Sequence, residues 1–290
     1  METEIEIEKE IVPLENQISF DFLLNDTHEK QSEEVTEETQ EVLRVGSFDW
    51  VAEETLVLLV KSDEKISHSF DICGKKMIDW VALSTSGCKQ KVIDAFNEDD
   101  ILEVVKKEAE DFKFVAVFFS DTPLLQKSTF MEIMNYFSMH RMNVLKLQRG
   151  YVFAGNYLQN AKMLLSSAIH DFGKDDFVVI DDAQKISFAF KILQNRILQY
   201  HKQRGVVLFG ENTIFVDADV EIEEGAVIFP NNIIKGESYV GKNAILESGN
   251  YILDTIICDE AFVQQSYLEK SKVEKGKVVG PFARLIKEEV

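Results

Sequence analysis

From Val216 onward the chain places an apolar residue at every sixth position, eight times in succession. The series is Val216, Ile222, Ile228, Ile234, Val240, Leu246, Ile252 and Cys258. An α-helix repeats every 3.6 residues and a strand every two, so neither produces a period of six. In a parallel β-helix, one residue of each hexapeptide points into a central prism. The period therefore predicts a hexapeptide-repeat β-helix over residues 206–290, with about four coils at about three hexapeptides per coil.

The zone before this repeat alternates strand-like and helix-like segments. Apolar runs at 54–60, 114–119, 150–158 and 175–182 are typical of strands, and residues 75–87, 99–112 and 120–140 have helical spacing. This alternation predicts an α/β sheet domain over residues 51–182. A long helix over residues 183–205, closed by Gly205, is expected to link it to the repeat.

The formal charge is concentrated at the N-terminus. Residues 1–50 hold 15 acidic and 3 basic residues, which is −12 of the total charge of −20. This composition predicts an acidic, flexible arm and disfavours nucleic acid or an anionic membrane as a partner. The sequence shows no apolar run of membrane-spanning length and no opening signal peptide, and it has three widely spaced cysteines. Together these features predict a cytoplasmic protein.

One apolar run ends in a carboxylate. The strand predicted at 114–119 is followed by Ser120, Asp121, Thr122 and Pro123. Ligands of open α/β sheets bind beyond the carboxyl ends of strands, so Asp121 could hold a metal ion. It could also cap a following helix that has Pro123 in its first turn, and the stretch alone favours this reading. The residues alone leave both readings open.

Several longer segments resemble one bacterial enzyme family. These are "FVDADVEI" and "VIFPN" in the repeat, "VVGPFARL" at 278–285, "VIDDAQKISFAFKILQNRILQYHKQRGV" at 179–206, "SDTPLL" at 120–125 and "CGKKMIDWV" at 73–81. They are similar to segments of the bifunctional N-acetylglucosamine-1-phosphate uridyltransferase/glucosamine-1-phosphate acetyltransferase, which makes UDP-N-acetylglucosamine for cell-wall synthesis. The resemblance covers about residues 55–290 and is patchy before 175.

The resemblance implies a fold and a set of site residues. The fold is a shortened nucleotidyltransferase-like, Rossmann-like sheet domain followed by a short left-handed β-helix, which assembles homotrimers in the family. Asp121 and Asp181 match the family's two magnesium ligands, and Thr122 and Gly74 match positions in its substrate-binding segments. Mg²⁺ is therefore the implied cofactor, and UTP or a UDP-sugar the implied ligand.

The sequence also departs from the family. No glycine-rich phosphate-binding loop follows the first strand, because the first glycine after residue 54 is Gly74. The uracil-reading segment has no counterpart, and the sugar-binding part is shortened. The acetyltransferase coils are missing after residue 285, so acetyl transfer is not expected. We therefore expect a divergent sugar-phosphate nucleotidyltransferase-like protein with reduced or lost catalysis. The alternative is a non-catalytic binding, regulatory or assembly protein in cell-envelope sugar metabolism.

Overall fold

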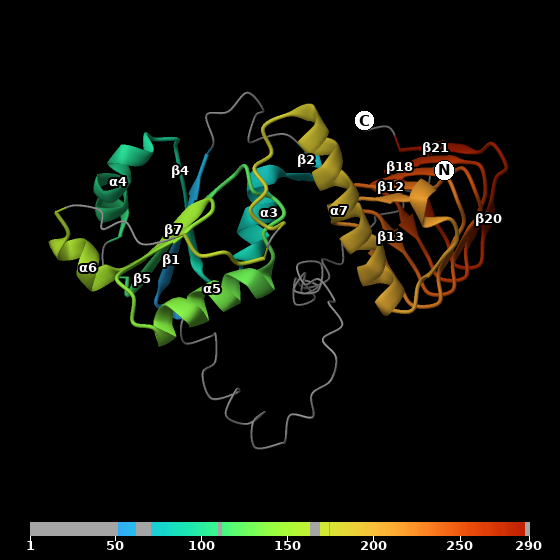
Figure 1. Ribbon diagram of the computed structural model, residues 1–290. Coiled ribbons are helices and arrows are strands. Elements are labelled where there is room, and N and C mark those ends of the chain that lie inside the picture. The colour runs from blue at the N-terminus through green and yellow to red at the C-terminus, as the bar shows by residue number, and fades with distance from the viewer. Residues whose placement is uncertain (1–51, 62–70, 110–111, 163–168, 174, 288–290) are drawn as a thin grey trace, which may run out of the picture.

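The computed structural model describes residues 52–61, 71–109, 112–162, 169–173 and 175–287. The predicted acidic arm at 1–50 lies outside these residues. Figure 1 shows a sheet domain and a β-helix, with the long helix α7 between them. An α/β sheet domain followed by a run of stacked parallel strands confirms the predicted fold class. No helix in the described part is both long and apolar enough to cross a lipid bilayer.

The sheet domain is built on five strands in the order β4-β1-β5-β7-β6. Their bounds are β1 Thr55–Val60, β4 Lys89–Ile93, β5 Phe114–Phe119, β6 Val144–Leu147 and β7 Gly150–Ala154. β1 lies parallel to both β4 and β5, whereas β7 runs antiparallel to β5 and β6. Every residue of β1 and β5 is buried, as expected for central strands covered on both faces.

Helices cover the two faces of this sheet. α3 (Met77–Ser84) and α5 (Lys127–Met139) pack on one face, in a core that includes Phe118 and Phe130. α4 (Ile101–Glu108) and α6 (Gly155–Asn160) pack on the other, in a core that includes Val117. A 3₁₀ turn, η2, precedes α4 at Glu98–Asp100. Successive residues of a strand point to opposite faces of a sheet, and the neighbours Val117 and Phe118 of β5 accordingly belong to the two different cores.

Three predicted elements differ in the structure. The strand predicted at 150–158 ends with β7 at Ala154, and residues 155–160 form the helix α6. The strand predicted at 175–182 is wrong, because these residues form turns and extended loop that pass the end of β5. The helix predicted to follow Asp121, with Pro123 in its first turn, begins only at Lys127, after Gln126 at its N-cap position. Asp121 and Pro123 therefore lie in a turn ahead of the helix, and the reading of Asp121 as a helix cap is wrong.

The linking helix α7 spans Ala183–Gln203 and contacts both parts of the molecule. On one side, Arg196 Nη1 donates to the Leu124 carbonyl at 2.9 Å, and Nη2 lies 3.7 Å from Asp176 Oδ1. Toward the β-helix, Gln194 Nε2 donates to the Val216 carbonyl at 3.3 Å. These three polar residues of the junction are buried, so their partners replace the hydrogen bonds that water would make.

The β-helix has three faces of stacked parallel strands. The first face holds β8 (Val207–Leu208), β11 (Val227–Ile228), β14 (Ile245–Leu246), β17 (Phe262–Val263) and β20 (Val278–Val279). The second holds β9 (Phe215–Val216), β12 (Ile233–Lys235), β15 (Tyr251–Leu253), β18 (Tyr267–Glu269) and β21 (Arg284–Ile286). The third holds β10 (Glu221–Ile222), β13 (Tyr239–Val240), β16 (Ile256–Ile257) and β19 (Lys272–Val273). A short hairpin of β2 (Asp71–Ile72) and β3 (Lys75–Lys76) packs beside the first coil, which also contains the 3₁₀ turn η3 (Glu211–Thr213).

The period of six fills the prism as predicted through Ile252, which is fully buried like the positions before it. The prediction that Cys258 is the next inward residue is wrong. Ile257 is the fully buried residue of that strand, and Cys258 is only partly buried. The side between β15 and β16 is one residue shorter than the earlier sides, and it turns at Asp254, whose φ is +47°. The inward residue is therefore reached one position earlier.

Candidate functional site

The candidate site lies where β5 ends, at the carboxylate singled out in the sequence. Asp121 is buried, with 1% of its surface exposed. Arg149 Nη2 donates to its Oδ2 at 2.7 Å, and Arg149 Nε donates to its Oδ1 at 3.2 Å. This two-point pairing matches the planar guanidinium to both oxygens of the carboxylate, the strongest arrangement available to an arginine and an acid.

The β6–β7 hairpin places Arg149 over the end of β5. Arg149 directly precedes β7, which pairs antiparallel with β5. Gly150 has φ +145°, and a Cβ there would lie 2.5 Å from the Val117 carbonyl oxygen, so the close approach of this hairpin requires glycine. The Arg149 Cζ atom is 3.9 Å from the Phe119 ring centroid. The aromatic face and the buried carboxylate thus hold one guanidinium between them.

The second predicted metal ligand, Asp181, follows a residue that is hydrogen-bonded to the backbone of the first, Asp121. The Ile180 N–H donates to the Asp121 carbonyl oxygen at 2.8 Å, which sets Asp181 beside the end of β5. The Asp181 carboxylate, however, forms an ion pair with Lys185, one turn further along the chain. Its side chain is 40% exposed, so this pair is solvated. Each of the two predicted metal ligands therefore already has a cationic side chain as its partner.

These residues do not fit a divalent metal ion as they stand. Mg²⁺ needs carboxylate oxygens that face an open coordination position, and both oxygens of Asp121 accept hydrogen bonds from Arg149. No group of three or more histidine, cysteine, aspartate or glutamate side chains is arranged to hold a metal within the described ranges. A metal ion at Asp121 would have to share the carboxylate with the Arg149 guanidinium or displace it.

The two predicted substrate-binding residues lie in different surroundings. Thr122 is fully buried, and its hydroxyl donates to the Phe119 carbonyl at 2.9 Å, which stabilises the turn after β5. Gly74 lies between β2 and β3 with φ +81°, and a Cβ there would lie 2.8 Å from Asp217 of the β-helix. The Cys73 carbonyl beside it accepts a hydrogen bond from the Ala218 N–H. Their substrate-binding roles stay predictions.

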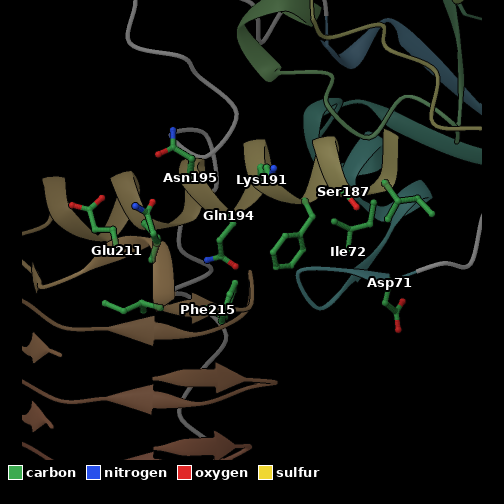
Figure 2. Close-up of a pocket in the computed structure, with 13 residues that line it drawn as sticks. Asp71, Ile72, Ser187, Lys191, Gln194, Asn195, Glu211 and Phe215 are labelled. Carbon is green, nitrogen blue, oxygen red and sulfur yellow. The ribbon is translucent and has the colours of Figure 1, made fainter. Parts of the chain in front are cut away.

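A cavity of about 820 Å³ opens between α7 and the first coil of the β-helix. Figure 2 shows Phe215 and Ile72 on its walls, with Lys191 and Asn195 of α7 at its rim. The volume suits a small molecule. None of the four predicted site residues lines it. Sequence reasoning missed this cavity, because its walls come from three separate segments, and the β2–β3 hairpin lies more than a hundred residues before the other two.

Cys73 and the partly buried Cys88 do not supply a reactive thiolate. Burial raises the pKa of the Cys73 thiol to about 12 and that of Cys88 to about 11. Both thiols are therefore protonated at neutral pH, and nucleophilic or metal-binding chemistry requires the thiolate. All three cysteines are free in the structure.

Several curated proteins are similar to parts of this chain. The "Bifunctional protein GlmU" of Clostridium botulinum is 31% identical over 132 residues, which is 44% of this chain and 29% of the relative. That of Streptococcus agalactiae is 26% identical over 194 residues, which is 65% of this chain and 41% of the relative. Parts of this chain are thus similar to parts of bifunctional GlmU proteins.

The match to GlmU is partial in both directions. The Clostridium beijerinckii GlmU is 31% identical over 137 residues, covering 46% of this chain and 30% of the relative. The chain thus spans less than half the length of the curated GlmU proteins that it matches. No family model matches it. The relationship to GlmU agrees with the resemblance seen in the sequence and with the order of a sheet domain followed by a β-helix.

Proposed function

We propose that this chain is a nucleotidyltransferase-like protein of cytoplasmic amino-sugar metabolism that has lost metal-dependent nucleotidyl transfer. In this proposal it acts as a non-catalytic binding, regulatory or assembly protein, with UTP or a UDP-sugar as the ligand class and a homotrimer built through the β-helix. The bidentate pairing of Asp121 with Arg149 is the observation that carries the proposal.

The chemical reason lies in what each cation can do. In nucleotidyl transfer a metal ion neutralises the triphosphate and can take phosphate oxygens into its coordination sphere. The Arg149 guanidinium neutralises Asp121 but has no coordination positions to offer, because it acts only through N–H donors. It is also held by Phe119 as well as by Asp121. The pair fills the end of β5 with an internal charge balance that needs no ion.

The sequence after β1 gives independent support for the same conclusion. The stretch after β1 contains no glycine before Gly74, so a glycine-rich loop of backbone N–H donors cannot form there. Removing one preorganised group that stabilises charge in a transition state costs roughly 3–4 kcal/mol. Loss of both the loop and the metal position leaves little stabilisation for a transferring phosphoryl group.

The alternative is an active Mg²⁺-dependent nucleotidyltransferase, in which Arg149 moves aside when metal and nucleotide bind. Metal binding distinguishes the two. Mn²⁺, observed by electron paramagnetic resonance, replaces Mg²⁺ as the probe. We expect no specific Mn²⁺ binding to the wild-type chain, but binding to Arg149→Ala, in which both Asp121 oxygens become accessible. Arg149→Lys keeps the positive charge and is the matched control, which we expect to resemble the wild type.

A second variant and an activity assay complete the test. Arg149→Ala combined with Asp121→Asn is expected to lose the gained Mn²⁺ signal, which would assign that signal to the carboxylate. Pyrophosphate release from UTP and N-acetylglucosamine-1-phosphate is expected to stay at background in the wild type. Wild-type Mn²⁺ binding that Asp121→Asn abolishes, together with pyrophosphate release, would instead establish the active enzyme.

A further inference from the structure

The five-stranded sheet has an open edge at β4. Within the described residues, β1 is the only strand that pairs with β4. The Lys61 N–H donates to the Ile93 carbonyl at 3.0 Å, so Ile93 directs its backbone toward β1. Backbone groups alternate in direction along a strand, and those of Gln90 and Val92 therefore face away from β1. An edge of this kind can accept one more strand.

The two faces of this edge differ in chemistry. Lys89 and Lys91 lie on the face toward α4, where Lys91 pairs with Glu108 and the Lys89 ammonium lies 5.1 Å from the Phe112 ring centroid. The other face points toward α3 and carries Gln90 and Val92, and Val92 is 50% exposed. One face of the edge is thus basic, and the other offers uncovered apolar surface.

A hollow lies beside the apolar face. Its volume is about 420 Å³, and Ala82, Leu83, Cys88 and Gln90 are among the residues that line it. Gln90 Nε2 donates to the Ala82 carbonyl at 2.7 Å, so α3 and β4 are joined at its floor. Apolar side chains arriving from a further strand next to β4 would find uncovered surface here.

The N-terminus of the chain carries a pattern that matches both faces. Glutamate occupies every even position from 2 to 10, and the odd positions 3 to 11 are Thr, Ile, Ile, Lys and Ile. Strict alternation of this length has the period of a strand and not of a helix. As a strand, the segment would present five carboxylates on one side and mainly apolar side chains on the other, before Pro13 ends it.

We propose that residues 2–11 add to the open edge of β4 as a further strand of the same sheet. The glutamates then lie beside Lys89 and Lys91, and the isoleucines cover Val92 and the hollow. Opposite charges on neighbouring strands and apolar pairs on the same face both stabilise a sheet. The occupant of the β4 edge is therefore a strand of the same chain, with glutamates on one side and mainly apolar side chains on the other.

The chain length allows this pairing within one molecule. The described chain begins at Ala52, just ahead of β1, and Leu56 of β1 lies opposite Lys89. The 40 residues between positions 11 and 52 give a linker with a root-mean-square span of roughly 35 Å. Tethering of this kind produces an effective concentration in the millimolar range. The other edge of the sheet is less open, because Ile169 forms a bridge with Lys146 of β6.

Hydrogen–deuterium exchange of the full-length chain tests the pairing. We expect the amides of Gln90 and Val92 to exchange roughly tenfold more slowly in the wild type than in a variant with residues 2–11 shuffled, in which the composition is kept and the alternation is lost. Lys89→Glu with Lys91→Glu should remove the same protection. Changing Glu4, Glu6 and Glu8 to Lys in that background should restore it. Amides of the central strand β5 serve as the internal control and should not change.

Three outcomes would overturn the proposal. Equal exchange of Gln90 and Val92 in the wild-type and shuffled chains would mean that no strand is added. Protection that disappears on hundredfold dilution would mean that the strand comes from a second molecule. Arm-dependent protection confined to another edge, such as β21 at the end of the β-helix, would place the segment elsewhere.

Discussion

Acid should destabilise this protein through the buried histidine His201. His201 lies near the C-terminal end of α7 with 2% of its surface exposed, and its Nδ1 atom has no hydrogen-bond partner among the described residues. Burial, together with a smaller effect of the nearby Arg204 guanidinium, lowers the pKa of His201 from 6.5 to about 4. The folded protein therefore holds this imidazole in its neutral form.

The size and sign of the effect follow from the two pKa values. Between pH 6.5 and 4 the unfolded chain protonates His201 while the folded chain does not, so the free energy of unfolding falls as the pH falls. The gap between the two values corresponds to about 3 kcal/mol, of which about 2 kcal/mol is lost by pH 5. Above about pH 6.5 the stabilisation is complete and no longer changes with pH.

Urea unfolding of the wild type and of His201→Gln, at pH 7.5 and at pH 5.0, measures this effect. Glutamine is neutral at both values, and the titrating carboxylates are common to both chains, so the difference between the chains isolates the histidine. The wild type should lose about 2 kcal/mol more than the variant over this interval. Equal losses would refute the argument, because they would mean that the imidazole is charged or solvated in the folded state.

Other substitutions test the fold and the assembly. Asp182→Ala removes the N-cap carboxylate that accepts from the Lys185 N–H at 2.8 Å, and should lower stability by about 1 kcal/mol in urea unfolding. Gly150→Ala would press a methyl group against the Val117 carbonyl, and a loss of about 2 kcal/mol or more is expected in thermal unfolding. Ile234→Ala empties a fully buried position in the prism and should cost about 3 kcal/mol by the same assay. Light scattering at micromolar concentration should give the mass of a trimer, and a clean monomer would contradict that prediction.

The β-helix was predictable from the sequence because its core has a simple rule. Each side of the prism takes one inward residue, and sides of equal length repeat that residue at a fixed interval. The rule holds from Val216 to Ile252. It fails at Cys258 because a corner at Asp254 shortens one side, and a turn of this kind depends on local backbone geometry that no period records.

Only one of the two residues of the central pair, Asp121, could be predicted from the sequence. Asp121 stands out because it ends a buried run, but the residue that pairs with it is 28 positions away. Arg149 reaches it through the antiparallel pairing of β7 with β5, whereas the sequence led us to expect alternating strands and helices. The only local signal was an arginine followed by glycine just before an apolar run. The partner of Asp181, in contrast, is Lys185, which is only four positions away in the sequence.

The position of α7 has a consequence for how the whole molecule moves. Arg196 holds the sheet domain and Gln194 holds the first coil of the β-helix, two residues apart on one rigid helix. Neither half can rotate against the other without breaking buried hydrogen bonds. In rotational diffusion the two halves therefore behave as one elongated particle, and nuclear relaxation measured on either half should report the same slow tumbling of the whole.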